Sequence, residues 1–225
     1  MKYKKVISAR FISRPNRFIA IAEVEGREEI CHVMNTGRMR ELLVPNAEIF
    51  LLPSENPARK TKFDLVAVRR ENEIVNIDSL APNKVAAEYI PTLFPSCKRI
   101  KPETKFGSSR FDFYIEDNFD KIFLEVKGVT LNRDGIAMFP DAPTLRGAKH
   151  LRELAAAKAE GYRAAVLFVI AMKGISSFAP NKETDPAFAA ALSAAKAAGV
   201  EIYAVDCTVT PDSVTADNKI PVRME

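Results

Sequence analysis

The chain of 225 residues contains few cysteines and few glycines. Its three cysteines, Cys31, Cys97 and Cys207, lie far apart and form no CxxC pair. Such an odd, scattered set argues against a disulfide framework or a zinc cluster and favours a protein of the reducing cytoplasm. With nine glycines and no Gly-rich phosphate loop, the sequence gives little support to a nucleotide-cofactor enzyme.

Long hydrophobic runs are also lacking. The longest uninterrupted run, residues 164–172, spans nine residues, which is too short to cross a bilayer. The basic start of the chain, residues 1–5, leads into no apolar stretch, so we expect no signal peptide. These absences predict a cytoplasmic protein without a membrane partner.

The composition is that of a soluble globular protein with a sizeable core, because 47% of the residues are hydrophobic and 28% are charged. The length allows one large domain or two small ones. The pattern of the sequence changes near residue 80, from short β-rich segments to a mixture of helical and strand segments. We therefore expect one domain over residues 1–81 and a second over residues 82–225.

The first domain is predicted to be a small β-barrel. Short segments with strand composition alternate with turn signals such as Asn35-Thr36-Gly37. An oligonucleotide-binding (OB) barrel is the first candidate for such a series, and a small sandwich is the alternative. The expected strands are residues 6–11, 18–24, 29–33, 48–52, 64–69 and 73–77.

The second domain is predicted to be an α/β fold. Thr144 and Asp185 are expected helix N-caps, and Gly161 and Gly199 stand where those helices should end. The expected helices cover residues 83–90, 144–161 and 185–199, and the expected strands cover residues 97–105, 110–116, 121–127, 164–171 and 200–206. The order is therefore helix, three strands, helix, strand, helix, strand.

The charge distribution favours a nucleic-acid partner. The net charge is only +4, but residues 1–22 carry six basic groups and no acid, interleaved with aromatic residues. The competing interpretation is that these cations only keep the surface soluble. The residues assigned to nucleic-acid binding are Lys4, Lys5, Arg10, Arg17, Arg38, Arg110, Arg146, Lys149 and His150.

Two neighbouring strands carry candidate catalytic residues. Alternation places Phe111, Phe113 and Ile115 on one face of the strand 110–116, and Asp112 on the other face. In the strand 121–127, Glu125 and Lys127 project from the same face. If the two strands pair, Asp112 approaches Glu125 across the ladder.

Two converging carboxylates form an oxygen-ligand site suited to Mg²⁺ or Mn²⁺. The backbone carbonyl of Val126 is a candidate third ligand, and Lys127 would stabilise charge on a phosphate or orient the attacking water. The competing interpretation is a salt bridge between Lys127 and either Asp112 or Glu125 on a solvated face of the sheet.

The order of these elements resembles the PD-(D/E)xK nuclease core, the restriction-endonuclease-like fold, with Phe-Asp in place of Pro-Asp at the first motif. In that core the leading helix often supplies another acid, for which Glu88 is the candidate. A resemblance over nearly the whole chain is to the sugar fermentation stimulation protein A family. It rests on five segments: HVMNTGRM at 32–39, SRFDF at 109–113, LEVKGVTL at 124–131, FPDA at 139–142 and RGAKHL at 146–151.

The family resemblance implies an OB-type barrel joined to a nuclease-like domain, non-specific DNA binding and a proposed regulatory role in sugar (maltose) metabolism. It also raises interest in His32 and Asn35, which lie in the first domain, and in Asp141, a candidate ligand or turn residue. On the helix after Thr144, helical spacing groups Arg146, Lys149 and His150 on a face that would bind a scissile phosphate.

Three functions remain open from the sequence. The first is a DNA-binding protein with a metal-dependent phosphodiesterase centre, and the second is a DNA-binding regulator whose nuclease fold is catalytically silent. The third is a metal-dependent hydrolase of a small phosphorylated metabolite. A homodimer through an exposed barrel edge is also plausible.

Overall fold

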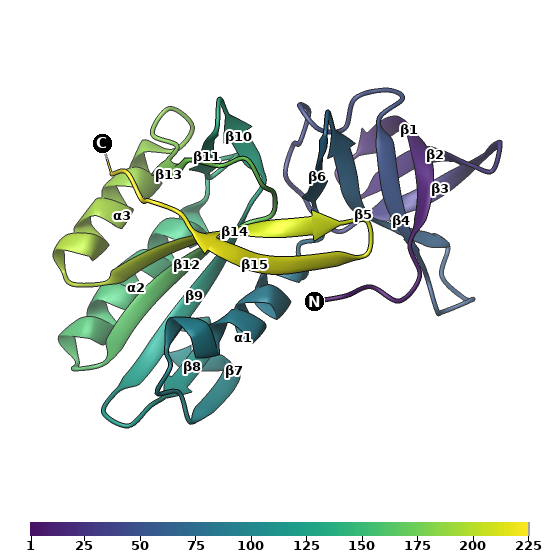
Figure 1. Ribbon diagram of the computed structural model, residues 1–225. Coiled ribbons are helices and arrows are strands. Elements are labelled where there is room, and N and C mark those ends of the chain that lie inside the picture. The colour runs from purple at the N-terminus through teal and green to yellow at the C-terminus, as the bar shows by residue number, and fades with distance from the viewer. Residues whose placement is uncertain (225) are drawn as a thin grey trace.

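The computed structural model describes residues 1–224 and shows a β-barrel beside a larger α/β domain (Figure 1). The barrel comes from the first part of the chain, and the N-terminus lies near the junction of the two domains (Figure 1). None of the helices in the described residues is long and apolar enough to cross a membrane.

The barrel confirms the OB prediction. Its strands run in the order β3-β2-β1-β4-β5-β6, and a parallel pairing between β3 and β5 closes the sheet on itself. Alternation fills the interior: in β2, Ala20, Ala22 and Val24 are buried, and the residues between them are partly exposed. The strands are β1 (Ile7–Asn16), β2 (Ile19–Val24), β3 (Arg27–Val33), β4 (Glu48–Pro53), β5 (Phe63–Arg70) and β6 (Glu73–Asn76).

Closure of the barrel changes one expectation. The end of β3 no longer offers an exposed edge to a second copy, because Cys31, His32 and Val33 pair with Phe63, Asp64 and Leu65. The homodimer remains a prediction, but the paired part of β3 does not support it.

The α/β domain contains a six-stranded sheet in the order β15-β14-β12-β9-β8-β7, with β9, β12 and β14 parallel. Helix α1 covers one face of this sheet, and helices α2 and α3 cover the other face. The central strand β12 is apolar along its length because both of its faces are covered. The helices are α1 (Ala81–Leu93), α2 (Leu145–Ala159) and α3 (Pro186–Ala197), and the strands are β7 (Arg99–Phe106), β8 (Ser109–Glu116), β9 (Lys121–Val129), β12 (Arg163–Ile170), β14 (Glu201–Thr210) and β15 (Ser213–Lys219).

Four strands of this domain were not predicted. Strands β10 (Leu131–Arg133), β11 (Ile136–Phe139) and β13 (Ser177–Pro180) form a small separate sheet, and each is too short to show a period-2 pattern. Strand β15 lies at a sheet edge with the mostly polar sequence SVTADNK, so it carries little hydrophobic signal.

The end of α1 was also predicted wrongly. The helix continues through Pro91 to Leu93 instead of ending at residue 90. Pro91 removes one intrahelical hydrogen bond, but the helix goes on for only two more residues, and the amide of Phe94 closes it by donating to the carbonyl of Ile90 at 2.8 Å.

Buried polar contacts join the two domains. Tyr3 donates its hydroxyl proton to Asp78 Oδ2 at 2.9 Å and accepts from Asn76 Nδ2 at 2.9 Å. The backbone amide of Asn76 donates to the carbonyl of Ala171 at 3.0 Å. Because these groups are buried and mutually satisfied, they fix the barrel against the sheet that carries the candidate site.

Candidate metal and nucleic-acid site

Asp112 lies where the β8–β9 ladder ends. The last backbone pair is Phe113 with Leu124, and beyond it the amide of Val126 donates to Asp112 Oδ2 at 2.7 Å. The other oxygen of Asp112 accepts from Asn83 Nδ2, in the first turn of α1, at 2.8 Å. The predicted pairing of these two strands is therefore confirmed, and the carboxylate of Asp112 takes the place of a ladder carbonyl.

The side chains of β8 do not alternate as predicted. Phe113 and Ile115 pack with α1, but Phe111 belongs to the core on the α2 side, where its ring lies 6.1 Å from that of His150. The cause is local, since the residues of β8 before Phe113 do not pair with β9 and the strict period of two does not hold there.

Glu125 is buried and strongly held. Its Oε1 atom accepts a hydrogen bond from Lys127 Nζ at 2.5 Å and contacts Nδ1 of His150, and the residue is 3% exposed. Although burial opposes ionisation, the hydrogen bonds from His150 and Lys127 outweigh it and hold the pKa of Glu125 below its usual range. Glu125 is therefore an anion at neutral pH.

A single polar atom of this cluster has no partner. Glu125 Oε2 is buried and makes no hydrogen bond. Burial raises the pKa of the neighbouring Asp112, and the charge of Glu125 raises it further. A bound cation would satisfy the unpaired oxygen and offset the repulsion between the two carboxylates, so the residues present fit a divalent metal.

The metal would need ligands besides the two acids. Among residues 1–224 there is no cluster of three or more His, Cys, Asp or Glu side chains arranged to hold an ion. Mg²⁺ is commonly held by one or two carboxylates together with waters and substrate phosphates, so this donor set suits Mg²⁺ better than a protein-enclosed site.

His150 is buried, which differs from the predicted exposed basic face. Its residue is 4% exposed, and Arg146 Nε donates to its Nε2 atom at 3.4 Å. Because a guanidinium can only donate, Nε2 is the acceptor, and Nδ1 carries the proton that faces Glu125. His150 therefore orients Glu125, and Arg146 and Lys149 remain exposed on the same helix.

Two hollows flank the acid pair. The first, the junction cleft, has a volume of about 400 Å³ and is lined by parts of residues 35–37, 76–83, 126–131 and 138–144 together with Ala171. The second, the basic pocket, has a volume of about 360 Å³ and lies between the β7–β8 turn and the start of α2. Asn83 and Val126, the partners of Asp112, line the junction cleft, and His150, the partner of Glu125, lines the basic pocket.

Family models match both parts of the chain. Residues 12–77 match the "SfsA N-terminal OB domain", and residues 80–213 match the "Sugar fermentation stimulation protein RE domain". The chain belongs to the sugar fermentation stimulation protein A family. The nuclease-like architecture of the second domain, predicted from the order of its elements, is thereby confirmed.

Relatives of this family match the chain over its full length. Two sugar fermentation stimulation protein homologues, from Desulfitobacterium hafniense (strain Y51) and Clostridium beijerinckii, are each 52% identical to it and cover 100% and 99% of this chain and 99% of their own. The solved structure of Pyrococcus furiosus SfsA in complex with Ca²⁺ superposes with a TM-score of 0.88 at 31% identity, covering 99% of this chain and 98% of that one.

Several residues named from the nuclease and family resemblances lie away from the acid pair. Glu88 points to the N-terminal amine, which it contacts at 2.7 Å, and Asn83 is the α1 residue that reaches Asp112 instead. Sequence reasoning missed Asn83, although a polar residue in the first turn of the helix that precedes the two acid-bearing strands was an available signal. Asp141 lines the junction cleft, and Asn35 caps its own turn by accepting from the amide of Gly37 at 2.8 Å.

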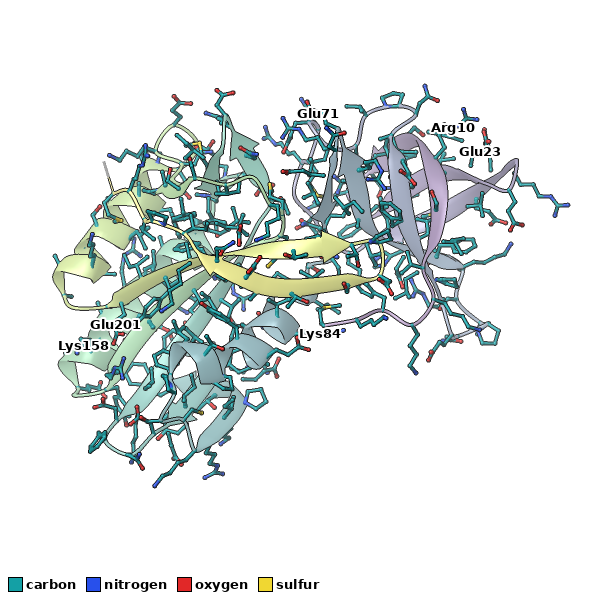
Figure 2. The ribbon with its side chains drawn as sticks, viewed as in Figure 1. Arg10, Glu23, Glu71, Lys84, Lys158 and Glu201 are labelled. Atoms are coloured by element: carbon teal, nitrogen blue, oxygen red, sulfur yellow. The ribbon has the colours of Figure 1, made fainter. Side chains whose placement is uncertain are left out.

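The predicted nucleic-acid residues divide into two groups. Arg110, Arg146, Lys149 and the buried His150 line the basic pocket beside the acid pair. The others are exposed on the barrel and the N-terminal segment, and some are engaged there: Arg10 pairs with Glu23 at 2.6 Å (Figure 2), and Arg17 lies over the ring of Phe18 at 5.4 Å. The exposed residues of this second group are Lys4, Lys5, Arg10, Arg17 and Arg38.

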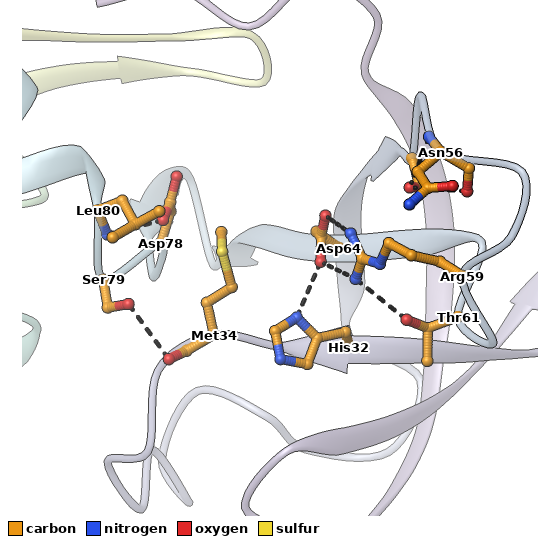
Figure 3. A network of polar contacts seen from close by, with 10 residues as sticks. His32, Met34, Asn56, Arg59, Thr61, Asp64, Asp78, Ser79 and Leu80 are labelled. Atoms are coloured by element: carbon orange, nitrogen blue, oxygen red, sulfur yellow. Dashed lines mark hydrogen bonds and ion pairs between the residues drawn. The ribbon is translucent and has the colours of Figure 1, made fainter.

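His32 belongs to a polar network inside the barrel wall (Figure 3). Its Nδ1 atom lies 2.9 Å from Asp64 Oδ1, and Arg59 donates to both oxygens of Asp64 at 2.8 Å. Asp64 is buried, and burial raises its pKa, but the hydrogen bonds from Arg59 and His32 outweigh this and hold the pKa below its usual range. This arrangement makes Asp64 a structural anion.

We expect Asp64→Asn to destabilise the fold by about 1–3 kcal/mol at pH 7, because it weakens charge-assisted hydrogen bonds to a buried carboxylate. The lowered pKa means that the contribution is complete above the unfolded-state pKa, about 3.9, and is lost as the pH falls through the folded-state value. Urea unfolding of both proteins at pH 7 and in acid measures the difference. Asp134→Asn, at an exposed acid, is the control. A deficit that did not shrink in acid would contradict this assignment.

Proposed function

We propose that this chain binds DNA without sequence preference and that Asp112, Glu125 and Lys127 form a Mg²⁺-dependent phosphodiesterase centre. The observation that carries the proposal is the unpaired, buried Oε2 atom of Glu125, beside the destabilised carboxylate of Asp112. Without a cation, the site contains an unpaired carboxylate oxygen and a second carboxylate that is disfavoured in its ionised form. A bound metal ion would stabilise both, which is the reason to assign the pair to metal binding.

The metal would be held by Asp112, Glu125 and the backbone carbonyl of Val126, and it would supply Lewis-acid activation of the phosphate and of the attacking water. His150 fixes the orientation of Glu125 by contacting its Oε1 atom, which leaves Oε2 for the ion. Lys127 contacts Glu125 Oε1 through Nζ and would place a positive charge beside the reacting phosphate. The Ca²⁺ bound to the Pyrococcus furiosus relative supports a divalent-ion site in this family.

DNA is the proposed substrate because the basic pocket lies beside the acid pair. Its three cations, Arg110, Arg146 and Lys149, would hold the phosphates that flank the reacting one. The cations of the barrel would extend this contact along the strand. Such contacts read the backbone rather than the bases, so we propose weak sequence preference. The relatives are named for sugar fermentation, and any regulatory role of this chain would act through the same DNA binding.

The test combines binding and cleavage of labelled single- and double-stranded DNA, with EDTA, Mg²⁺ or Mn²⁺. We expect the wild-type protein to bind with a steep salt dependence and to cleave only with a metal. Arg146→Gln and Lys149→Gln should each lower the slope of log K against log salt by about 1. Lys127→Ala should retain binding and lose cleavage.

The outcomes separate the open functions. Salt-sensitive binding without cleavage in either metal would contradict the catalytic half of the proposal and indicate a nuclease fold used for binding alone. If affinity did not change between low and physiological salt, DNA binding itself would be wrong, and a small phosphorylated metabolite would become the better substrate.

A further inference from the structure

The two hollows beside the acid pair differ sharply in chemistry. The basic pocket is lined by three cations. The junction cleft is larger, but among the described residues its lining contains no lysine, arginine or histidine, and it does contain three asparagines and two aspartates. A groove that tracked the phosphate backbone would be expected to carry cations throughout, so the junction cleft suits a different part of the substrate.

The chemistry of the junction cleft fits an uncharged, flat and polar group. Ile77, Pro82 and Met138 offer apolar contact, and the amides and carboxylates offer hydrogen bonds. Its volume, about 400 Å³, lies within the usual range for small-molecule sites. A nucleobase has these properties, and it would be joined through its sugar to the phosphate that the acid pair attacks.

We propose that the junction cleft receives one nucleobase extruded from the DNA stack, at the nucleotide next to the reacting phosphate. This inference rests on the proposed function, because the basic pocket and the acid pair hold the backbone of the same strand. It implies that the preferred substrate contains an unpaired nucleotide, since such a base is the least costly to extrude.

Asp141 is the residue that would read the extruded base. Within residues 1–224 its carboxylate makes no ion pair and no hydrogen bond, whereas Asp78, the other acid of the cleft, accepts from Tyr3 and from the amide of Leu80. Nearby Arg14 donates from its two terminal nitrogens to four backbone carbonyls and faces Asp141 without forming a hydrogen bond or ion pair with it. Asp141 is therefore an available acceptor.

A carboxylate selects bases that offer N–H donors. Guanine presents two adjacent donors on one edge, adenine and cytosine present an amino group, and thymine presents one imino donor between two carbonyl acceptors. The preference expected of Asp141 is therefore guanine first and thymine last.

Leu145 supports the extrusion of a base independently. It is 90% exposed at the start of α2, where burial of a leucine would be the norm. It lines the basic pocket, and the preceding residue, Thr144, lines the junction cleft, so Leu145 stands between the two hollows. An exposed apolar side chain at this position can fill the gap that an extruded base leaves in the duplex.

The experiment compares a fully paired short duplex with the same duplex carrying one bulged guanosine. Affinity is measured by fluorescence anisotropy with the full-length protein in Ca²⁺, and a gel confirms that the DNA stays intact. We expect the bulged duplex to bind about tenfold more tightly, and a bulged thymidine to lose most of that gain. Asp141→Ala should remove the preference for the bulge, measured as the ratio of the affinities of the same protein for the bulged and paired duplexes.

Two further variants test the geometry. Gly37→Ala places a Cβ 2.4 Å from Asp141 Oδ2, so it should displace the carboxylate and reduce the preference without removing an acid. Leu145→Ser should also reduce the preference for the bulged duplex. The matched controls are Asp134→Ala, at an exposed acid outside the cleft, and Phe119→Ser, at an apolar residue that is 88% exposed on the β8–β9 turn.

Equal, salt-sensitive affinity for paired and bulged duplexes would overturn this inference and leave the proposed DNA-binding function standing. Failure to bind either duplex would overturn both. Free guanosine is the last probe: if it bound through Asp141 in a calorimetric titration while neither duplex bound, the ligand of the cleft would be a free nucleoside, and the inference would again be wrong.

Discussion

Asp112→Asn is expected to lower metal-dependent DNA cleavage by at least about 1,000-fold, because a metal's stabilisation of transition-state charge is worth several kcal/mol. The same substitution should make the metal-free protein more stable. Burial raises the pKa of Asp112, as does the charge of Glu125, so its ionised form is disfavoured in the folded state. An asparagine removes this charge and can still accept from the amide of Val126.

The pH dependence of this gain has a definite sign. An acid whose folded-state pKa is raised costs stability when it ionises, so the advantage of asparagine should be largest above the raised pKa of Asp112 and should vanish in acid. Thermal unfolding of the wild type and Asp112→Asn in EDTA, at neutral and acidic pH, measures this difference in stability. Added Ca²⁺ should raise the Tm of the wild-type protein and leave that of Asp112→Asn unchanged, because only the wild type binds the ion.

Glu88→Gln is the matched control for this substitution. Glu88 is the acid that the nuclease resemblance offered on the leading helix, but it pairs with the N-terminal amine. Its loss should therefore leave both the Ca²⁺ response and cleavage intact. If Asp112→Asn kept its Ca²⁺ response and its cleavage, the acid pair would not be the metal site.

The acid pair could be predicted from sequence because its placement depends on local rules. Glu125 and Lys127 are two residues apart on one strand, so they share a face whatever surrounds them. Asp112 lies on the neighbouring strand, and the hairpin between the strands brings it near Glu125. The barrel was predictable for the same reason, since its short strands alternate and end in recognisable turns.

The rest of the site depends on how distant elements pack, and no local pattern encodes that packing. Helical spacing groups His150 with Arg146 and Lys149, but the sheet against which α2 packs decides that His150 is buried against Glu125. Asn83 reaches Asp112 only because α1 docks closely: a Cβ on Gly128 would lie 2.6 Å from Pro82 Cγ. The junction cleft joins segments from both domains, which the sequence separates by up to 136 residues, the distance from Asn35 to Ala171 (171 − 35).

Phe168→Ala is expected to cost about 3–5 kcal/mol of unfolding free energy, the usual loss for a phenylalanine removed from a closed core. Phe168 has no exposed surface and lies in β12, the central parallel strand. Its ring stacks on Phe178 with centroids 4.0 Å apart and contacts Phe139 at 5.7 Å. With strands on both sides and aromatic rings around it, this position has little room to collapse into the cavity.

Phe168 also lies between the core and the residues of the candidate site. Phe168 is the register partner of Lys127, and Phe139 begins the segment that carries Asp141 into the junction cleft. Urea unfolding at neutral pH measures the loss, and an unchanged m-value would show that the transition stays cooperative. Phe119→Ala, at a ring that is 88% exposed, should change stability by less than about 0.5 kcal/mol. A loss below about 1 kcal/mol for Phe168→Ala would mean that the core under β8 and β9 repacks freely, and that these strands are not held as rigidly as the tight hydrogen bonding of Asp112 and Glu125 requires.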